Sequence, residues 1–254
     1  MGDSVVVPVG PASARTDCAV LVMSSEKYRD LWPPFFTLFW QYWPDCPFPV
    51  YLGTTAGTYD HPKVTTLHTG DDVWSKCFRR ALERVDTEYV LLFLEDFFVS
   101  EPISTIEIVR HLHVLQELDG IVLRLFPQPS PDAPLSDHAG IGRIHPDAAY
   151  RVSLQVALWK RRRLLDLIRD EESIWDFELK GTPRSRTMPD GFYGTYEPVI
   201  SYRHVVERGE WFRKAAEYYR TQPIGCDFTA RPIMGRMKTV RKALYRRRRA
   251  WLPQ

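Results

Sequence analysis

Two adjacent carboxylates, Glu95 and Asp96, directly follow an apolar run over residues 89–94. An apolar run of this length predicts a strand that is buried on both faces, as in parallel sheets. Ligands of open α/β sheets bind at the carboxyl ends of the strands. Because unpaired buried carboxylates are costly, we expect this pair to meet water, a cation or a metal-bound phosphate. The alternative, that one of them caps the next helix, is weakened by Ser104, which marks a later helix start.

A second acidic pair, Asp176 and Glu178, lies in the segment 173–181 beside Trp175 and Phe177. If this segment is helical, the two carboxylates do not share a face, because helix neighbours are three or four residues apart. A carboxylate in partly apolar surroundings has a raised proton affinity, which suits a general base. The alternative is that Asp176 only stabilises the positive end of the helix dipole.

The elements that must position these residues alternate between strands and helices. Apolar runs predict strands, and apolar residues at helical spacing predict helices between them. This order is typical of parallel βαβ units and predicts one α/β domain with a mixed, mostly parallel central sheet flanked by helices. The expected strands are 18–23, 49–52, 64–67, 89–94 and 121–125, with helices around 33–42, 74–85 and 103–118.

The second half of the chain has a different pattern. Residues 127–146 are rich in proline and predict a loop over the edge of the sheet. Residues 150–159 predict one or two strands, and residues 160–169 predict a helix. Arg124, inside an apolar strand, needs a partner.

Composition narrows the class of protein. With 254 residues and 44% hydrophobic residues, the chain can bury the core of one α/β domain. A net charge of +2 is too balanced to predict a nucleic-acid partner. The four cysteines stand far apart, which predicts reduced thiols and neither a zinc site nor disulfides. No segment reaches the roughly 18 apolar residues of a membrane span, so we expect a cytoplasmic protein.

The two ends of the chain differ from its centre. Residues 1–16 predict a loose leader, and residues 231–254 form a basic tail that includes four arginines at 246–249. Apolar residues among these cations predict an amphipathic helix that rests on an anionic membrane surface. A solvated terminal helix is the alternative.

The order of the acidic motifs resembles that of the GT-A glycosyltransferases, which bind nucleotide sugars with a Rossmann-like fold. In that superfamily an acidic motif ends a strand, as residues 94–97 do here, and a strand, a helix and a second acidic motif follow, as in 153–165 and 175–179. The chain is more narrowly similar to bacterial enzymes that make surface polysaccharides or related glycans. The similar stretches are 24–32, 41–44, 73–75, 94–97 and 206–211, and the resemblance covers about residues 17 to 220.

The resemblance implies a catalytic domain over 17–230, with a donor half at about 17–126 and an acceptor half at about 147–220. Glu95 and Asp96 would bind Mn²⁺ or Mg²⁺ and the donor diphosphate. Asp176 would be the base that activates the acceptor hydroxyl, with Glu178 as the second choice. The expected reaction is direct displacement with inversion, onto a glycan, a lipid-linked acceptor or a small molecule.

The same resemblance implies that further polar residues contact the donor. Each has an alternative explanation: the serines can belong to a turn, the aspartates can cap a helix, the arginine can lie on a solvated helix face, and the histidine can be structural. The implied contacts are Ser24 and Ser25 with the base of the donor, Asp71 and Asp72 with the nucleoside, Arg80 with the diphosphate, and His204 with a metal ion or phosphate.

The chain departs from the family at both acidic motifs. The common first motif is Asp-x-Asp, but Phe97 stands where the second Asp is expected, which leaves a metal-independent mode open. The second motif has Trp175 before Asp176 in place of a Glu-Asp pair. Two alternatives therefore stay open: a carbohydrate- or membrane-binding protein that has lost the chemistry, or a nucleotidyltransferase. The latter would need a glycine-rich first loop, which residues 24–27 lack.

Overall fold

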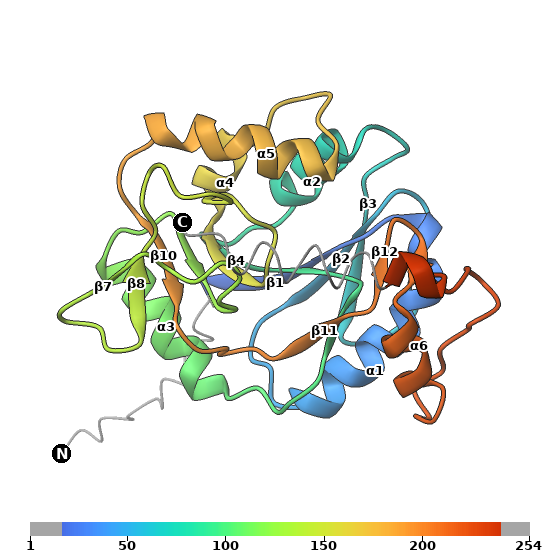
Figure 1. The fold of residues 1–254 in the computed structure, drawn as a ribbon. Helices are drawn as coiled ribbons and strands as arrows, with labels where there is room; N and C mark the ends of the chain where they lie inside the picture. Colours follow the sequence, from blue (N-terminus) through green and yellow to red (C-terminus); the bar gives the residue numbers. More distant parts are fainter. Residues whose placement is uncertain (1–16, 240–254) are drawn as a thin grey trace, which may run out of the picture.

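A nine-stranded mixed sheet forms the centre of the computed structural model, which describes residues 17–239 (Figure 1). Its strand order is β3-β2-β1-β4-β9-β6-β10-β8-β7. Every strand of this sheet except β9 and β8 runs in the same direction. The predicted α/β class with a mostly parallel sheet is therefore confirmed. The strands are β1 (Cys18–Met23), β2 (Val50–Thr54), β3 (Val64–His68), β4 (Tyr89–Leu94), β6 (Val122–Arg124), β7 (Ala133–Pro134), β8 (Ile141–Arg143), β9 (Ala157–Lys160) and β10 (Phe192–Thr195).

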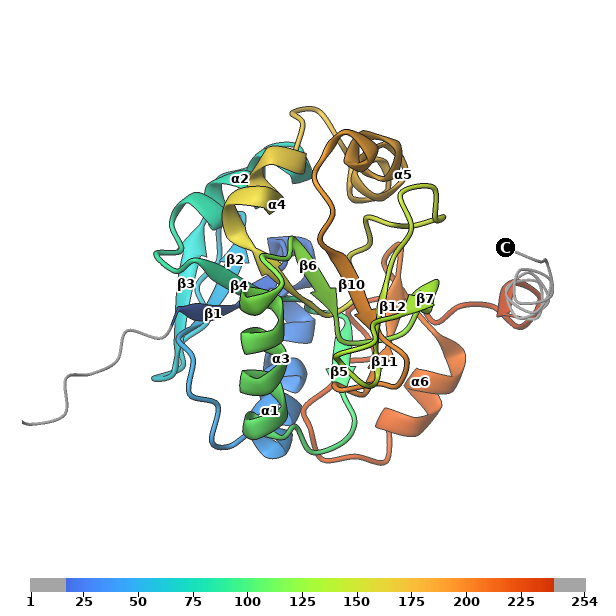
Figure 2. The same cartoon turned by 90° about the vertical axis from the view of Figure 1, so that its left-hand side faces the viewer.

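Helices cover both faces of the sheet, which is why the central strands consist of apolar residues without alternation. Every residue of β1 and β4 is buried, and the two strands pair in parallel from Cys18 opposite Tyr89 to Met23 opposite Leu94. In Figures 1 and 2 one group of helices lies on one side of the sheet and a second group on the other. The first group is α2 (Trp74–Glu83), α4 (Arg161–Leu167) and α5 (Ile174–Arg184), and the second is α1 (Trp32–Tyr42) and α3 (Thr105–Glu117).

Smaller elements lie beyond the carboxyl end of β4. The chain turns at Glu95 and Asp96 into β5 (Phe97–Val99), which pairs antiparallel with β11 (Tyr202–His204). A hairpin of β12 (Val206–Glu207) and β13 (Glu210–Trp211) and the helix α6 (Arg213–Tyr219) follow. The 3-10 helices η1 (Glu26–Leu31) and η2 (Ser185–Thr187) complete the described elements. This arrangement brings residues from the second half of the chain against the acidic turn.

The second half differs from the expected pattern in its strands. Of the expected strand region 150–159, only residues 157–159 lie in a strand, β9, which runs antiparallel between β4 and β6. The proline-rich segment is more than a loop, because it supplies β8 and the edge strand β7. The buried Arg124 finds its partners here, since its guanidinium donates to the carbonyl oxygens of Pro129, Tyr150 and Arg151 at 2.7, 2.9 and 3.3 Å.

The prolines at 33 and 34 lie in the first turn of α1, where an N–H has no partner in the helix. The start of α2 differs from one expectation. Asp71 and Asp72 do not cap α2: its N-cap residue is Val73, and no side chain caps it by a hydrogen bond. That cap expectation was wrong.

The leader, residues 1–16, and the tail from residue 240 onward lie outside the described residues, so the predicted membrane contact of the tail stays a prediction. Within residues 17–239, no helix combines the length and the apolar composition needed to cross a membrane.

Candidate functional site

The acidic turn lies where β4 ends, next to the end of its parallel neighbour β1. Glu95 is almost fully buried, at 7% exposure. Burial raises the pKa of Glu95 well above its usual range, and the neighbouring carboxylate of Asp96 raises it further. Ser24 follows β1 and accepts a hydrogen bond at 2.8 Å from the indole nitrogen of Trp32, which fixes the hydroxyl at this edge of the sheet.

Asp96 and His204 meet although they are far apart in the sequence. The pairing of β5 with β11 puts His204 opposite Phe97, and His204 Nε2 lies 2.9 Å from Asp96 Oδ2. The backbone supports this contact, because Val205 donates its N–H to the carbonyl oxygen of Asp96 at 2.9 Å. The other carboxylate oxygen, Asp96 Oδ1, is buried and has no hydrogen-bond partner among the described residues. A buried oxygen in this state would be stabilised by a cation or a donor from a ligand.

These residues line a cavity of about 220 Å³. We call it the acidic cavity, because Glu95, Asp96, Glu178 and Glu207 supply four carboxylates to its lining. The residues predicted to form a site and brought together here are Ser24, Ser25, Glu95, Asp96, Glu178 and His204.

Glu178 is the carboxylate of α5 that faces the acidic cavity. Its Oε1 accepts a 2.7 Å hydrogen bond from the backbone N–H of Leu154, which orients the carboxylate. Burial raises the pKa of Glu178 above its usual value. A fixed carboxylate with raised proton affinity has the properties of a general base.

Asp176 lies in a different environment and does not line the acidic cavity. It forms a capping box with Ser173, whose hydroxyl donates to Asp176 Oδ2 at 2.6 Å, and it pairs with Lys180 at 2.9 Å. The hydrogen bonds from Ser173 and Lys180 lower the pKa of Asp176 to about 2. Its geometry matches the alternative that the sequence left open, the stabilisation of the helix N-terminus.

Asp71, Asp72 and Arg80 do not line the acidic cavity. Arg80 donates to Asp72 Oδ2 and to the carbonyl oxygen of Thr69, both at 2.8 Å. Asp72 Oδ1 also accepts from the N–H of Val73 at 2.8 Å. These contacts tie the start of α2 to the end of β3.

Arg208 and Trp175 line the acidic cavity, although sequence reasoning assigned a role there to neither of them. Arg208 and Gly209 form the tip of the β12–β13 hairpin with φ values of 51° and 78°, as two-residue hairpin turns require. The guanidinium carbon of Arg208 lies 5.4 Å from the centre of the Trp175 ring, which extends from α5. The Arg-Gly pair inside the stretch 206–211 was the available signal for this turn.

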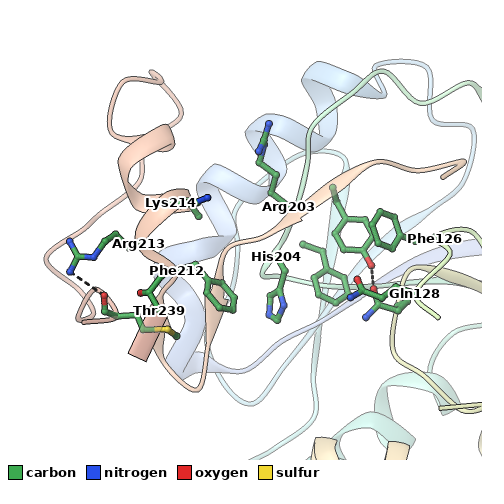
Figure 3. Close-up of a pocket in the computed structure, with 13 residues that line it drawn as sticks. Phe126, Gln128, Arg203, His204, Phe212, Arg213, Lys214 and Thr239 are labelled. Carbon is green, nitrogen blue, oxygen red and sulfur yellow. Dashed lines mark hydrogen bonds between the residues drawn. The ribbon is translucent and has the colours of Figure 1, made fainter. Parts of the chain in front are cut away.

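A second cavity of about 500 Å³ shares Phe97, Gln155 and His204 with the first (Figure 3). We call it the basic cavity, because three basic side chains and no Asp or Glu are among its described lining residues. The other walls are mainly aromatic. In Figure 3 His204 and Phe212 lie between the basic residues 213 and 214 on one side and Phe126 and Gln128 on the other.

A metal ion would find an incomplete set of protein ligands at the acidic turn. Within residues 17–239, no group of three or more His, Cys, Asp or Glu side chains is arranged to hold a metal ion. Asp96 and His204 nevertheless provide ligand atoms side by side, including the unpartnered Asp96 Oδ1. Mg²⁺ is commonly bound by one or two carboxylates together with water and the phosphates of a substrate. The residues therefore fit a divalent ion that binds together with a phosphate ligand.

Comparison with known proteins finds solved structures that share the general fold at low sequence identity. No family model and no curated protein matches the chain. Solved structures with a similar fold include TarS 1-349 from S. aureus, with 16% identity, a TM-score of 0.44, and 70% of this chain and 60% of that chain covered. The 2-C-methyl-D-erythritol 4-phosphate cytidylyltransferase from Thermus thermophilus has 14% identity, a TM-score of 0.42, and 90% and 98% covered. The galactosyltransferase LgtC has 11% identity, a TM-score of 0.38, and 85% and 84% covered.

The matched part of this chain spans less than two thirds of TarS 1-349. Since these TM-scores lie below 0.5, the likenesses establish neither a family nor an activity.

Proposed function

We propose that this protein is a glycosyltransferase that moves a sugar from a nucleotide-sugar donor to an acceptor hydroxyl in the acidic cavity. The observation that supports this most is the meeting of Ser24, Asp96, Glu178 and His204 around one cavity at the carboxyl ends of β1 and β4. Ligands of open α/β sheets bind at this edge. The cavity combines candidate diphosphate-binding groups with a separate candidate base, which such a transfer needs.

The donor diphosphate would face Asp96, His204 and Arg208. A divalent ion, when bound, would be held by Asp96 and His204 and would neutralise charge on the departing diphosphate. Arg208 can contribute in the same direction without a metal ion, because guanidinium groups bind phosphate oxygens in pairs. Arg208 makes no ion pair within residues 17–239, so a phosphate would not have to displace a carboxylate from it.

Glu178 would act as the base in a direct displacement. The acceptor oxygen bonds to the anomeric carbon as its proton passes to Glu178, and the bond from that carbon to the diphosphate oxygen breaks. This gives inversion at the anomeric carbon. Asp176, the first choice from the sequence, is a weaker candidate, because its lowered pKa and its bonds to Ser173 and Lys180 oppose proton uptake.

The test is turnover with a panel of nucleotide sugars, with and without Mn²⁺. UDP-GlcNAc, which TarS binds in its solved structure, is one member of the panel. Release of the nucleoside diphosphate and formation of a glycoside with the inverted configuration are expected. Nucleoside triphosphate consumption with diphosphate release would instead indicate a nucleotidyltransferase. Donor binding without any transfer or hydrolysis would indicate a protein that has lost the chemistry.

A further inference from the structure

The basic cavity continues from the acidic cavity on the side of the candidate base. Gln155 and His204 line both cavities, and Gln155 follows Leu154, whose N–H holds Glu178. The hydroxyl of Tyr202 donates to Gln155 Oε1 and fixes this shared wall. An acceptor whose hydroxyl reaches Glu178 would therefore extend past Gln155 into the basic cavity.

Aromatic rings form much of the wall of the basic cavity. The ring centres of Phe97 and Phe126 both lie 4.5 Å from that of Tyr202. The ring centre of Phe212 lies 5.2 Å from that of His204. Small-molecule sites are commonly lined by such rings with a few polar groups that fix orientation. Flat apolar faces beside the amide of Gln128 suit the ring of a sugar.

The basic side chains that line the basic cavity have no carboxylate beside them among its described lining residues. Within residues 17–239, Lys214 makes no ion pair, and it is exposed. Arg213 donates to the carbonyl oxygen of Met234 at 3.1 Å, while its Nε is buried without a partner. Arg203 extends away from His204 and Phe212 in Figure 3, and its guanidinium carbon lies 4.6 Å from the centre of the Tyr218 ring. An anion bound here would gain the charges of Arg213 and Lys214 without displacing an acidic side chain.

We propose that the basic cavity binds the phosphate of a phosphorylated sugar acceptor, with the sugar ring against the aromatic wall. Arg213 and Lys214 both line the cavity, and their charges suit a phosphate dianion. This inference rests on the proposed function and adds the chemical class of the acceptor. The phosphate could be free in solution or could join the sugar to a lipid, since both present the same oxygens to Arg213 and Lys214.

The test is a calorimetric titration of N-acetylglucosamine 1-phosphate, with N-acetylglucosamine as the neutral comparison and with UDP already saturating the protein. We expect the phosphorylated sugar to bind about tenfold or more tightly, since hydrogen bonds to charged groups are strong. Lys214→Ala together with Arg213→Gln should remove this preference. Lys63→Ala is the matched control, because Lys63 lies near the ring of Trp40 and does not line the basic cavity.

Equal binding of the two sugars would overturn the inference. So would much weaker binding of the phosphorylated sugar in the presence of UDP than in its absence, because the two ligands would then share one site. A protein that binds and hydrolyses nucleotide sugars but shows either result keeps its proposed function and loses only this inference. A protein that binds no nucleotide sugar loses the proposed function itself.

Vesicles that carry a polyprenyl diphosphate-linked sugar separate the two sources of phosphate. Retention on these vesicles that depends on Lys214 and exceeds retention on plain phosphatidylcholine supports the lipid-linked form. Binding of the soluble sugar phosphate alone supports the free form. Absence of both would overturn the inference.

Discussion

The acidic and the basic cavity share a wall but differ in the charge that they offer to a substrate. Glu95, Asp96, Glu178 and Glu207 line the first, whereas no Asp or Glu is among the described residues that line the second. An anionic ligand in the acidic cavity needs a compensating cation, from solution or from Arg208. An anionic ligand in the basic cavity does not. The two cavities are therefore suited to two different substrates, although they meet at Phe97, Gln155 and His204.

Substitution at the acidic turn should reduce activity more than any other change. Asp96→Asn removes the charge that pairs with His204 and that would hold a metal ion. We expect transfer to fall by a factor on the order of a hundred or more, the scale seen when a group that stabilises transition-state charge is lost. Initial rates with the preferred donor measure this, and circular dichroism checks the fold. Glu107→Gln, an exposed carboxylate paired with Arg110, is the control and should retain normal activity.

Separate substitutions of the two acidic residues of α5 should distinguish their roles. Glu178→Gln should lower kcat by a factor on the order of a hundred with donor binding unchanged, because it removes the base. Asp176→Asn should leave the rate nearly normal and lower the melting temperature, because it weakens the capping box. The opposite outcome, with a collapse in Asp176→Asn and a normal Glu178→Gln, would return the role of base to Asp176.

The pH dependence should follow Glu178. A base acts only when it is ionised, and burial raises the pKa of Glu178. We therefore expect kcat/KM to fall as the pH drops through a value above the usual range of glutamate, and to level off above it. A pH profile of the wild type measures this. An acid limb that persists unchanged in the residual activity of Glu178→Gln would show that another group is the base.

Substitution at the tip of the β12–β13 hairpin should have only a modest effect. Arg208→Ala should weaken binding of the nucleoside diphosphate by about tenfold without metal and by less with Mn²⁺, since the ion would then carry part of the charge. Calorimetry in the two buffers measures both values. Arg220→Ala is the matched control, because Arg220 stacks on Phe228 at a similar 5.5 Å and does not line either cavity. Equal weakening in both variants would remove Arg208 from the proposed site.

The sequence predicted those structural features of the candidate site that depend on local pattern. The apolar run of β4 and the carboxylates after it predicted a buried strand with an acidic end, and the structure has both. The alternation of strands and helices predicted the sheet. These features follow from neighbouring residues, whose spacing is visible in the chain.

The remaining features depend on contacts between distant residues. The antiparallel insertion of β9 between β4 and β6 has no local signal, because strand direction is set by the path of the intervening chain. The choice between Asp176 and Glu178 depends on which side of α5 faces the sheet. The sequence nevertheless contains a capping-box pattern, with Ser173 three residues before Asp176, that predicts a helix cap. The basic cavity is built from separate segments, and no single one of them suggests it.

The most direct measurement is a side-by-side calorimetric titration of the preferred nucleoside diphosphate into three proteins, with Mn²⁺ present. These are the wild type, Asp96→Asn and Lys214→Ala. If the acidic cavity is the donor site, the nucleotide binds the wild type and Lys214→Ala with similar affinity and binds Asp96→Asn at least about tenfold more weakly. Normal binding to Asp96→Asn with a loss in Lys214→Ala would place the donor in the basic cavity and rule out the acidic cavity as the donor site.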